Sequence, residues 1–150
     1  MIIYIFGNPD LKFDSLPVKI LPKLRKKFPN IKFKIKDPNE EWDTFMEHGT
    51  RNTEHKTTNT DHKTPNYLYI IDTVIGLKNV AVFNDISVFK KSPAISLHDF
   101  DLYADLILMK KLGKLSNLTV IGIPPDYTKE KAYNEITNKI LKINYYGIIS

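Results

Sequence analysis

The sequence predicts an α/β fold, a three-layer α/β/α sandwich with a mostly parallel sheet of five strands, one of them antiparallel. Short apolar and β-branched runs alternate with longer segments of helical periodicity, which is typical of this class. Several runs are apolar at every position, as strands buried on both faces are. One link, residues 73–78, is too short for a parallel crossover and therefore predicts the antiparallel strand.

Length and composition indicate one domain over residues 1–150 with a substantial core, since 42% of the 150 residues are hydrophobic. The chain has no cysteine, which excludes thiol catalysis, disulfide bonds and thiolate metal sites. The apolar run at its start is too short for a signal sequence or a membrane span. We therefore expect a cytoplasmic protein with no membrane partner.

The net charge is +5, and basic residues cluster on one face of the first expected helix. No aromatic residues interleave with them, as they do on surfaces that stack RNA bases. We interpret the cluster as a solvated face and expect no nucleic-acid partner, with an acidic partner or a nucleic acid as the alternative. The residues are Lys19, Lys23, Arg25, Lys26 and Lys27.

The chain opens with a strand, a loop and a helix. Residues 2–6 form an apolar run that Gly7-Asn8-Pro9 breaks. Apolar spacing predicts a helix over residues 16–28, which Asp14 or Ser15 can cap. Pro22 is expected to kink this helix or to shift its start. Its apolar face comprises Leu16, Ile20, Leu21 and Leu24.

The next segments change from strand to polar loop. Residues 31–36 alternate between apolar residues and lysine, which predicts a strand near a sheet edge with one wet face. Residues 37–39 turn the chain, and residues 40–47 suit a short helix carrying Trp42, Phe45 and Met46.

Residues 48–66 are polar and threonine-rich, and we expect them to form a mobile surface loop. A heptad is repeated at residues 52–58 and 59–65, so histidines recur every seven residues, at His48, His55 and His62. The repeat is interpreted as a duplicated polar heptad, and a weak metal-binding tract is the alternative.

The second half predicts two further buried strands, over residues 67–72 and 118–123, and an antiparallel strand over residues 79–83. Residues 86–89 suit a short turn or helix. Ser96 and Asp99 match a capping box before a helix over residues 100–112, and Gly113 suits its end. Its expected core stripe comprises Leu102, Leu106, Met109 and Leu112. Thr128 can cap a last helix over residues 129–144, whose inward residues are Ala132, Ile136, Ile140 and Ile143.

The candidate site consists of Asp14, Asp72 and His98, each at a predicted strand end or helix start. Open α/β sheets place their ligands at the carboxyl ends of the strands. Two carboxylates and one imidazole suit a divalent metal with open coordination positions. Each residue also has a purely structural reading: Asp14 as a helix cap, Asp72 as a strand end and His98 as part of a capping box.

At these residues the chain resembles the nickel–iron hydrogenase maturation endopeptidases, prokaryotic enzymes that remove a C-terminal extension from the hydrogenase large subunit after nickel insertion. The resemblance covers residues 5–20, 69–72, 95–102 and 118–125. It implies that the metal-binding acid, the second acid and the histidine of the family fall on Asp14, Asp72 and His98, which would be both catalytic residues and metal ligands.

The resemblance implies a cytoplasmic endopeptidase whose partner is a hydrogenase large-subunit precursor. Its metal would be nickel carried by that substrate, with other divalent metals as substitutes. The chain departs from the family where an acidic pair followed by glycine is replaced by Phe13-Asp14 and Pro17, and where Asp37-Pro38-Asn39 replaces a loop associated with substrate choice. Two alternatives remain: a metal-binding accessory protein without proteolysis, and a nucleotide- or nucleic-acid-binding domain.

Overall fold

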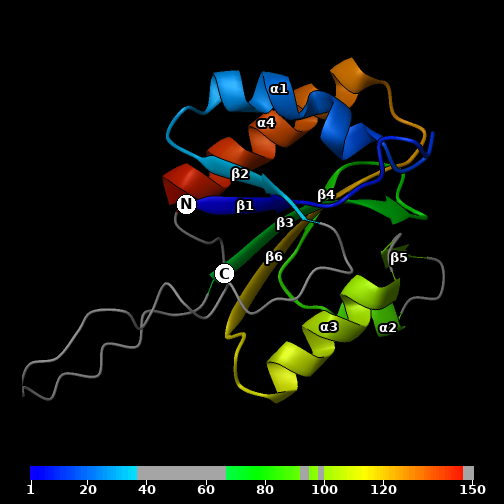
Figure 1. Cartoon of the computed structure of the whole chain (residues 1–150), viewed down its shortest axis with the longest axis vertical. Coiled ribbons are helices and arrows are strands. Elements are labelled where there is room, and N and C mark those ends of the chain that lie inside the picture. Colours follow the sequence, from blue (N-terminus) through cyan, green and yellow to red (C-terminus); the bar gives the residue numbers. More distant parts are fainter. Residues whose placement is uncertain (37–66, 92–94, 98–99, 147–150) are drawn as a thin grey trace, which may run out of the picture.

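The computed structural model describes residues 1–36, 67–91, 95–97 and 100–146 of the chain. Figure 1 shows strands in the middle and helices on both sides, so the predicted α/β fold is confirmed. The elements are β1 (Ile2–Ile5), α1 (Leu16–Lys27), β2 (Lys32–Ile35), β3 (Tyr67–Ile75), β4 (Ala81–Phe83), α2 (Ser87–Lys91), β5 (Ser96–Leu97), α3 (Phe100–Lys111), β6 (Asn117–Ile123) and α4 (Lys129–Tyr146).

The strands lie in the order β2-β1-β3-β6-β4. The first four run parallel, and β4 pairs antiparallel with β6, which confirms the antiparallel strand predicted from the short link. The two-residue strand β5 was not predicted. It pairs antiparallel with the end of β3, at Val74 and Ile75, beyond the last residue that β3 pairs with β1.

The helices form two layers, with α1 and α4 on one face of the sheet and α2 and α3 on the other (Figure 1). Neighbouring residues of β3 show that both faces are covered. Ile71 packs in the cluster that includes α1 and α4, Ile70 packs in the cluster that includes α3, and both side chains are fully buried. The uniformly apolar runs therefore reflect burial on both faces.

Helix α1 begins at Leu16 and continues through Pro22 to Lys27, so the proline does not shift its start. Pro22 lies on the exposed side, opposite the predicted apolar face, which is buried. Ser15 occupies the N-cap position without a side-chain capping bond. The predicted cap by Ser15 is therefore wrong in its chemistry, because its hydroxyl donates to the Lys12 carbonyl at 3.2 Å and accepts from Lys19 Nζ at 2.6 Å.

The ends of α3 match the prediction in part. The predicted capping position of Ser96 is wrong, because Ser96 lies in β5, where it pairs with Ile75 of β3, and the helix begins only at Phe100. Gly113, with φ of +70°, ends the helix as predicted, and the Lys114 N–H donates to the Met109 carbonyl at 2.9 Å. The prediction that Leu112 belongs to the core is wrong, because the helix ends before Leu112 and its side chain is exposed.

Helix α4 begins as predicted, because Thr128 Oγ1 accepts the Lys131 N–H at 3.2 Å.

The predicted turn at 37–39, the helix over 40–47 and the polar loop over 48–66 with its three histidines lie outside the described residues. In the part of the chain that the structure describes, no helix is both long enough and apolar enough to cross a membrane.

Candidate functional site

The loop that follows β1 is folded around Asp14. Gly7 has φ of +141°, and a Cβ added there would lie 2.6 Å from the Asp14 carbonyl oxygen, so this close approach requires glycine. The Asn8 N–H donates to Asp14 Oδ2 at 2.6 Å, and Asp14 is only 4% exposed. Asp14 thus holds the loop closed across six residues.

Local hydrogen bonds of the backbone and of the Asn8 side chain complete this loop. Asn8 Oδ1 accepts the Asp10 N–H at 2.9 Å, and the Asn8 carbonyl accepts the Leu11 N–H at 3.2 Å. The Leu11 carbonyl then accepts the Asp14 N–H at 3.1 Å. Two successive turns therefore deliver Asp14 to the start of α1 with both its backbone and one carboxylate oxygen fixed.

Asp72 lies inside β3 and is completely buried. The prediction that the strand ends there is wrong, because β3 continues to Ile75 with β6 beside it as far as Thr73 and β5 beside its last two residues. The pairing of β3 with β1 nevertheless ends at Ile71. Asp72 therefore borders the carboxyl end of β1, and its Oδ1 accepts the Thr73 N–H at 2.7 Å.

The chain of contacts from β3 to the loop connects the regions of the two acids. The Phe6 N–H donates to the Ile71 carbonyl at 3.0 Å, and the next two residues, Gly7 and Asn8, contact Asp14. Asp14 thus lies in the loop that follows β1, and Asp72 lies within β3 beside the carboxyl end of β1. Open α/β sheets bind ligands at the carboxyl ends of their strands.

Lys36 is a third buried charged residue at this edge, and the sequence prediction missed it. The Lys36 N–H donates to the Ile5 carbonyl at 3.0 Å, which places Lys36 beside Phe6 and in the same row as Asp72. Residues in one row of a parallel sheet share a face, and two strand spacings separate these Cα atoms by roughly 10 Å.

The prediction that the lysines of residues 31–36 form a solvent-exposed face is therefore wrong at the end of β2. There Lys36 is 7% exposed and Ile35 is 52% exposed. The one signal in the sequence that could have indicated this burial is the position of Lys36 directly after a strand, at the carboxyl edge of the sheet.

His98, the third predicted ligand, lies outside the described residues. Within residues 1–36, 67–91, 95–97 and 100–146, no group of three or more histidine, aspartate or glutamate side chains is arranged to hold a metal ion. Asp14 and Asp72 supply two carboxylates, the hard oxygen donors that divalent metals accept. The donor chemistry fits a divalent metal, whereas the ammonium of Lys36 in the row of Asp72 opposes a cation there by charge repulsion.

Comparisons with models of known protein families, with curated protein sequences and with solved structures found no match for this chain.

Proposed function

We propose that this protein is an endopeptidase of the hydrogenase maturation type, acting in the cytoplasm on a nickel-loaded hydrogenase large-subunit precursor. The observation that carries the proposal is the burial of Asp14 in the loop after β1 and of Asp72 within β3, beside the carboxyl end of β1. Buried carboxylates at such an edge are typical of sites that bind a ligand or catalyse a reaction. The resemblance of residues 5–20, 69–72, 95–102 and 118–125 to that family supports the same reaction.

In this proposal, Asp14, Asp72 and His98 contact the nickel that the precursor carries, which supplies Lewis-acid polarisation of the scissile carbonyl. One aspartate takes a proton from a water molecule as its oxygen attacks the carbonyl carbon. The C–N bond then breaks and the leaving amine takes up the proton. Asn8 and Thr73 each fix one carboxylate oxygen by a backbone N–H, so both acids are oriented before the substrate arrives.

The test is cleavage of a nickel-loaded large-subunit precursor, followed by the loss of its C-terminal extension on a gel and by mass spectrometry. Asp72→Asn and His98→Ala are expected to lower the cleavage rate by at least about 100-fold. Asp85→Asn, which changes an exposed aspartate beside α2, is the matched control and should cleave like the parent. Equal cleavage by the parent and the two site variants would contradict the proposed site.

A binding protein without proteolysis is the first alternative, and the β1–α1 loop favours it. Phe13, where the family has an acid, is exposed, and Pro17, at the family's glycine position, is buried in the first turn of α1. Nickel binding that Asp14→Asn and Asp72→Asn abolish, without cleavage of several precursors, would establish this alternative.

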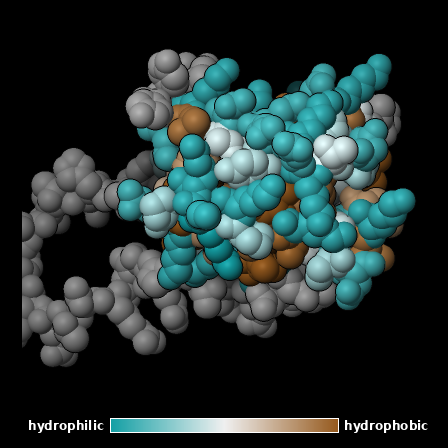
Figure 2. All heavy atoms as spheres, turned by 90° about the horizontal axis from the view of Figure 1, so that it is seen from above, coloured by the Kyte–Doolittle hydropathy of each residue, from teal (hydrophilic) through white to brown (hydrophobic). Residues whose placement is uncertain are grey.

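A nucleic-acid-binding domain is the second alternative, and the layer of α1 and α4 favours it. All five basic residues of α1 are exposed and α1 contains no acid, while α4 adds four lysines against two glutamates. Figure 2 looks onto this layer and shows mostly hydrophilic side chains. RNA affinity that falls steeply with salt, and that falls further in Lys23→Glu and Lys26→Glu, would support this alternative.

A further inference from the structure

Helix α3 is apolar on the side that faces the sheet and also exposes apolar side chains on the side that faces away from it. Its inner residues Leu102, Leu106 and Met109 are buried in the core. On the outer side, Ala104 is exposed and Leu108 is 54% exposed, and Leu112, one turn further, is 58% exposed. The outer side of α3 therefore carries exposed apolar side chains beside the half-buried Asp105.

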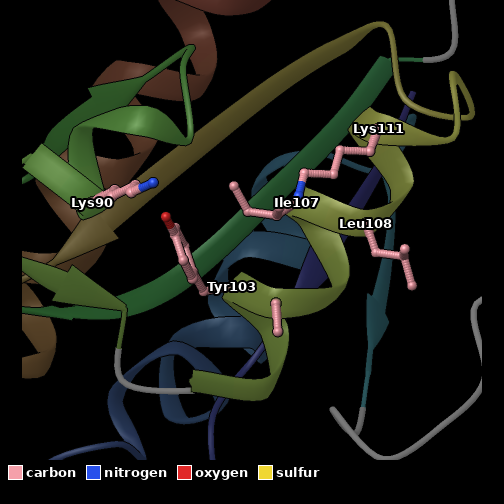
Figure 3. Close-up of a pocket in the computed structure, with 6 residues that line it drawn as sticks. Lys90, Tyr103, Ile107, Leu108 and Lys111 are labelled. Atoms are coloured by element: carbon pink, nitrogen blue, oxygen red, sulfur yellow. The ribbon is translucent and has the colours of Figure 1, made fainter.

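A groove of about 520 Å³ runs along this outer side of α3, next to α2. Its size lies within the range of pockets that proteins use to bind ligands. Figure 3 shows Lys90 of α2 and Tyr103 of α3 pointing toward one another across the gap, with Ile107 projecting from the same side of α3. The lining residues are Lys90, Tyr103, Ala104, Ile107, Leu108 and Lys111.

The charged residues that line this groove are both basic, and Asp105 of α3 lies outside the lining. Helices α2 and α3 both end in a pair of lysines, Lys90-Lys91 and Lys110-Lys111. Lys110 is engaged by Asp85 at 3.3 Å, whereas Lys90 and Lys111 line the groove, and none of the residues that line it is acidic. An apolar floor flanked by two lysines is complementary to an apolar segment that carries acidic side chains.

We propose that the groove between α2 and α3 binds a short acidic amphipathic helix of a partner protein. Two or three apolar side chains on one face of that helix fill the space along Tyr103, Ile107 and Leu108, and flanking Asp or Glu side chains meet Lys90 and Lys111. This mode reads apolar anchors at helical spacing, as helix-in-groove recognition does. The inference is independent of the proposed peptidase activity, because it uses neither Asp14 nor Asp72.

Two other occupants fit the observations less well. A second copy of the chain, docked symmetrically through the same groove, would bring Lys90 and Lys111 of each copy close to the lysines of the other, and like charges repel. Nucleic acid would leave the apolar floor formed by Ile107 and Leu108 without a partner, since its affinity comes mainly from phosphate contacts.

The test uses the full chain and a fluorescent helical peptide of about 14 residues, with leucine at positions i, i+4 and i+7 and glutamate beside them. Binding is measured by fluorescence anisotropy. A second peptide has lysine in place of glutamate, and a third has serine in place of leucine. The proposal expects the first peptide to bind at least about tenfold more tightly than either of the others.

Two exposed residues of the groove supply the variants. Leu108→Ser and Lys111→Glu should each weaken binding of the acidic peptide by about tenfold or more, and circular dichroism should show unchanged folding. Ile75→Ser and Lys27→Glu, which replace an exposed apolar residue of β3 and an exposed lysine of α1 in the same way, are the matched controls and should bind like the parent.

Three results would overturn the proposal. The first is equal affinity for the acidic and basic peptides. The second is a dimer in sedimentation velocity that Leu108→Ser converts to a monomer, which would make a second copy the occupant. The third is binding that appears only after the five acidic residues within 37–47 are replaced by serine, which would make the chain's own acidic segment the occupant.

Discussion

At the scale of single residues, Gly7 and Asp14 depend on each other. Only glycine permits both the positive φ of residue 7 and the close approach of the Asp14 carbonyl. The carboxylate of Asp14 in turn holds the Asn8 N–H. The same residue therefore closes the loop and stands at the candidate site, so a loss of activity on changing Asp14 must be separated from a loss of loop structure.

Gly7→Ala should lower the free energy of unfolding by about 3 kcal/mol, because it combines an unfavourable φ with a backbone clash. Gly113→Ala is the matched control: its φ is also positive, but nothing lies within 4 Å of the added Cβ. It should cost only about 1 kcal/mol. Urea denaturation of both variants measures the difference, and equal losses would show that the Asp14 contact contributes nothing.

Lys36→Met should strengthen nickel binding by up to about tenfold if nickel binds at Asp72, because it removes a positive charge from the same row of the sheet. Lys34→Met, two rows earlier on the same face of β2, is the control and should change the affinity less, since its Nζ lies over the Tyr4 ring. Calorimetric titration with nickel gives both affinities. Weaker binding in Lys36→Met would mean that this lysine supports the site.

At the scale of elements, the long apolar segments were predictable and the short connections were not. Strand β6 and helix α4 follow from local periodicity and, for α4, from the cap at Thr128. Strand β5 has only two residues, and it forms because β3 extends beyond β1 and leaves an open edge at Val74 and Ile75. No local pattern encodes that opening, so the helix start was wrongly placed at Ser96.

The start of α2 depends on Asp85, whose carboxylate accepts the Ser87 N–H at 3.0 Å and the Ser87 hydroxyl at 2.5 Å. These two hydrogen bonds, with a smaller contribution from Lys110, lower the pKa of Asp85 from 3.8 to about 2. The carboxylate therefore stabilises the folded state above about pH 4, and this contribution disappears as the pH falls toward 2.

Asp85→Asn should thus lower the free energy of unfolding at pH 7, by less than about 1 kcal/mol because the site is exposed and screened by solvent. The difference between parent and variant should shrink between pH 4 and pH 2. Urea denaturation at a series of pH values measures it. A difference that stays constant down to pH 2 would contradict the role of the ionised carboxylate.

At the scale of the whole molecule, the sheet lies between two helical layers, so neighbouring residues of β3 face different cores. Ile70→Val and Ile71→Val should each lower the free energy of unfolding by about 1 kcal/mol, because both side chains are fully buried. Ile35→Val, on the exposed edge of β2, should change it by less than about 0.5 kcal/mol. Thermal or urea unfolding measures all three, and a neutral result at Ile70 or Ile71 would mean that one face is uncovered.

The sequence by itself determined the fold class, the antiparallel strand, the buried face of α1 and the position of Asp14 after the first strand. These features follow from local periodicity, loop length and turn residues, which depend on neighbours along the chain. Only the tertiary structure decided that Asp72 lies within a strand, that Lys36 is buried in its row and that α3 leaves an apolar groove uncovered by described residues. These depend on which strands and helices pack together, and burial at a sheet edge is set by that packing.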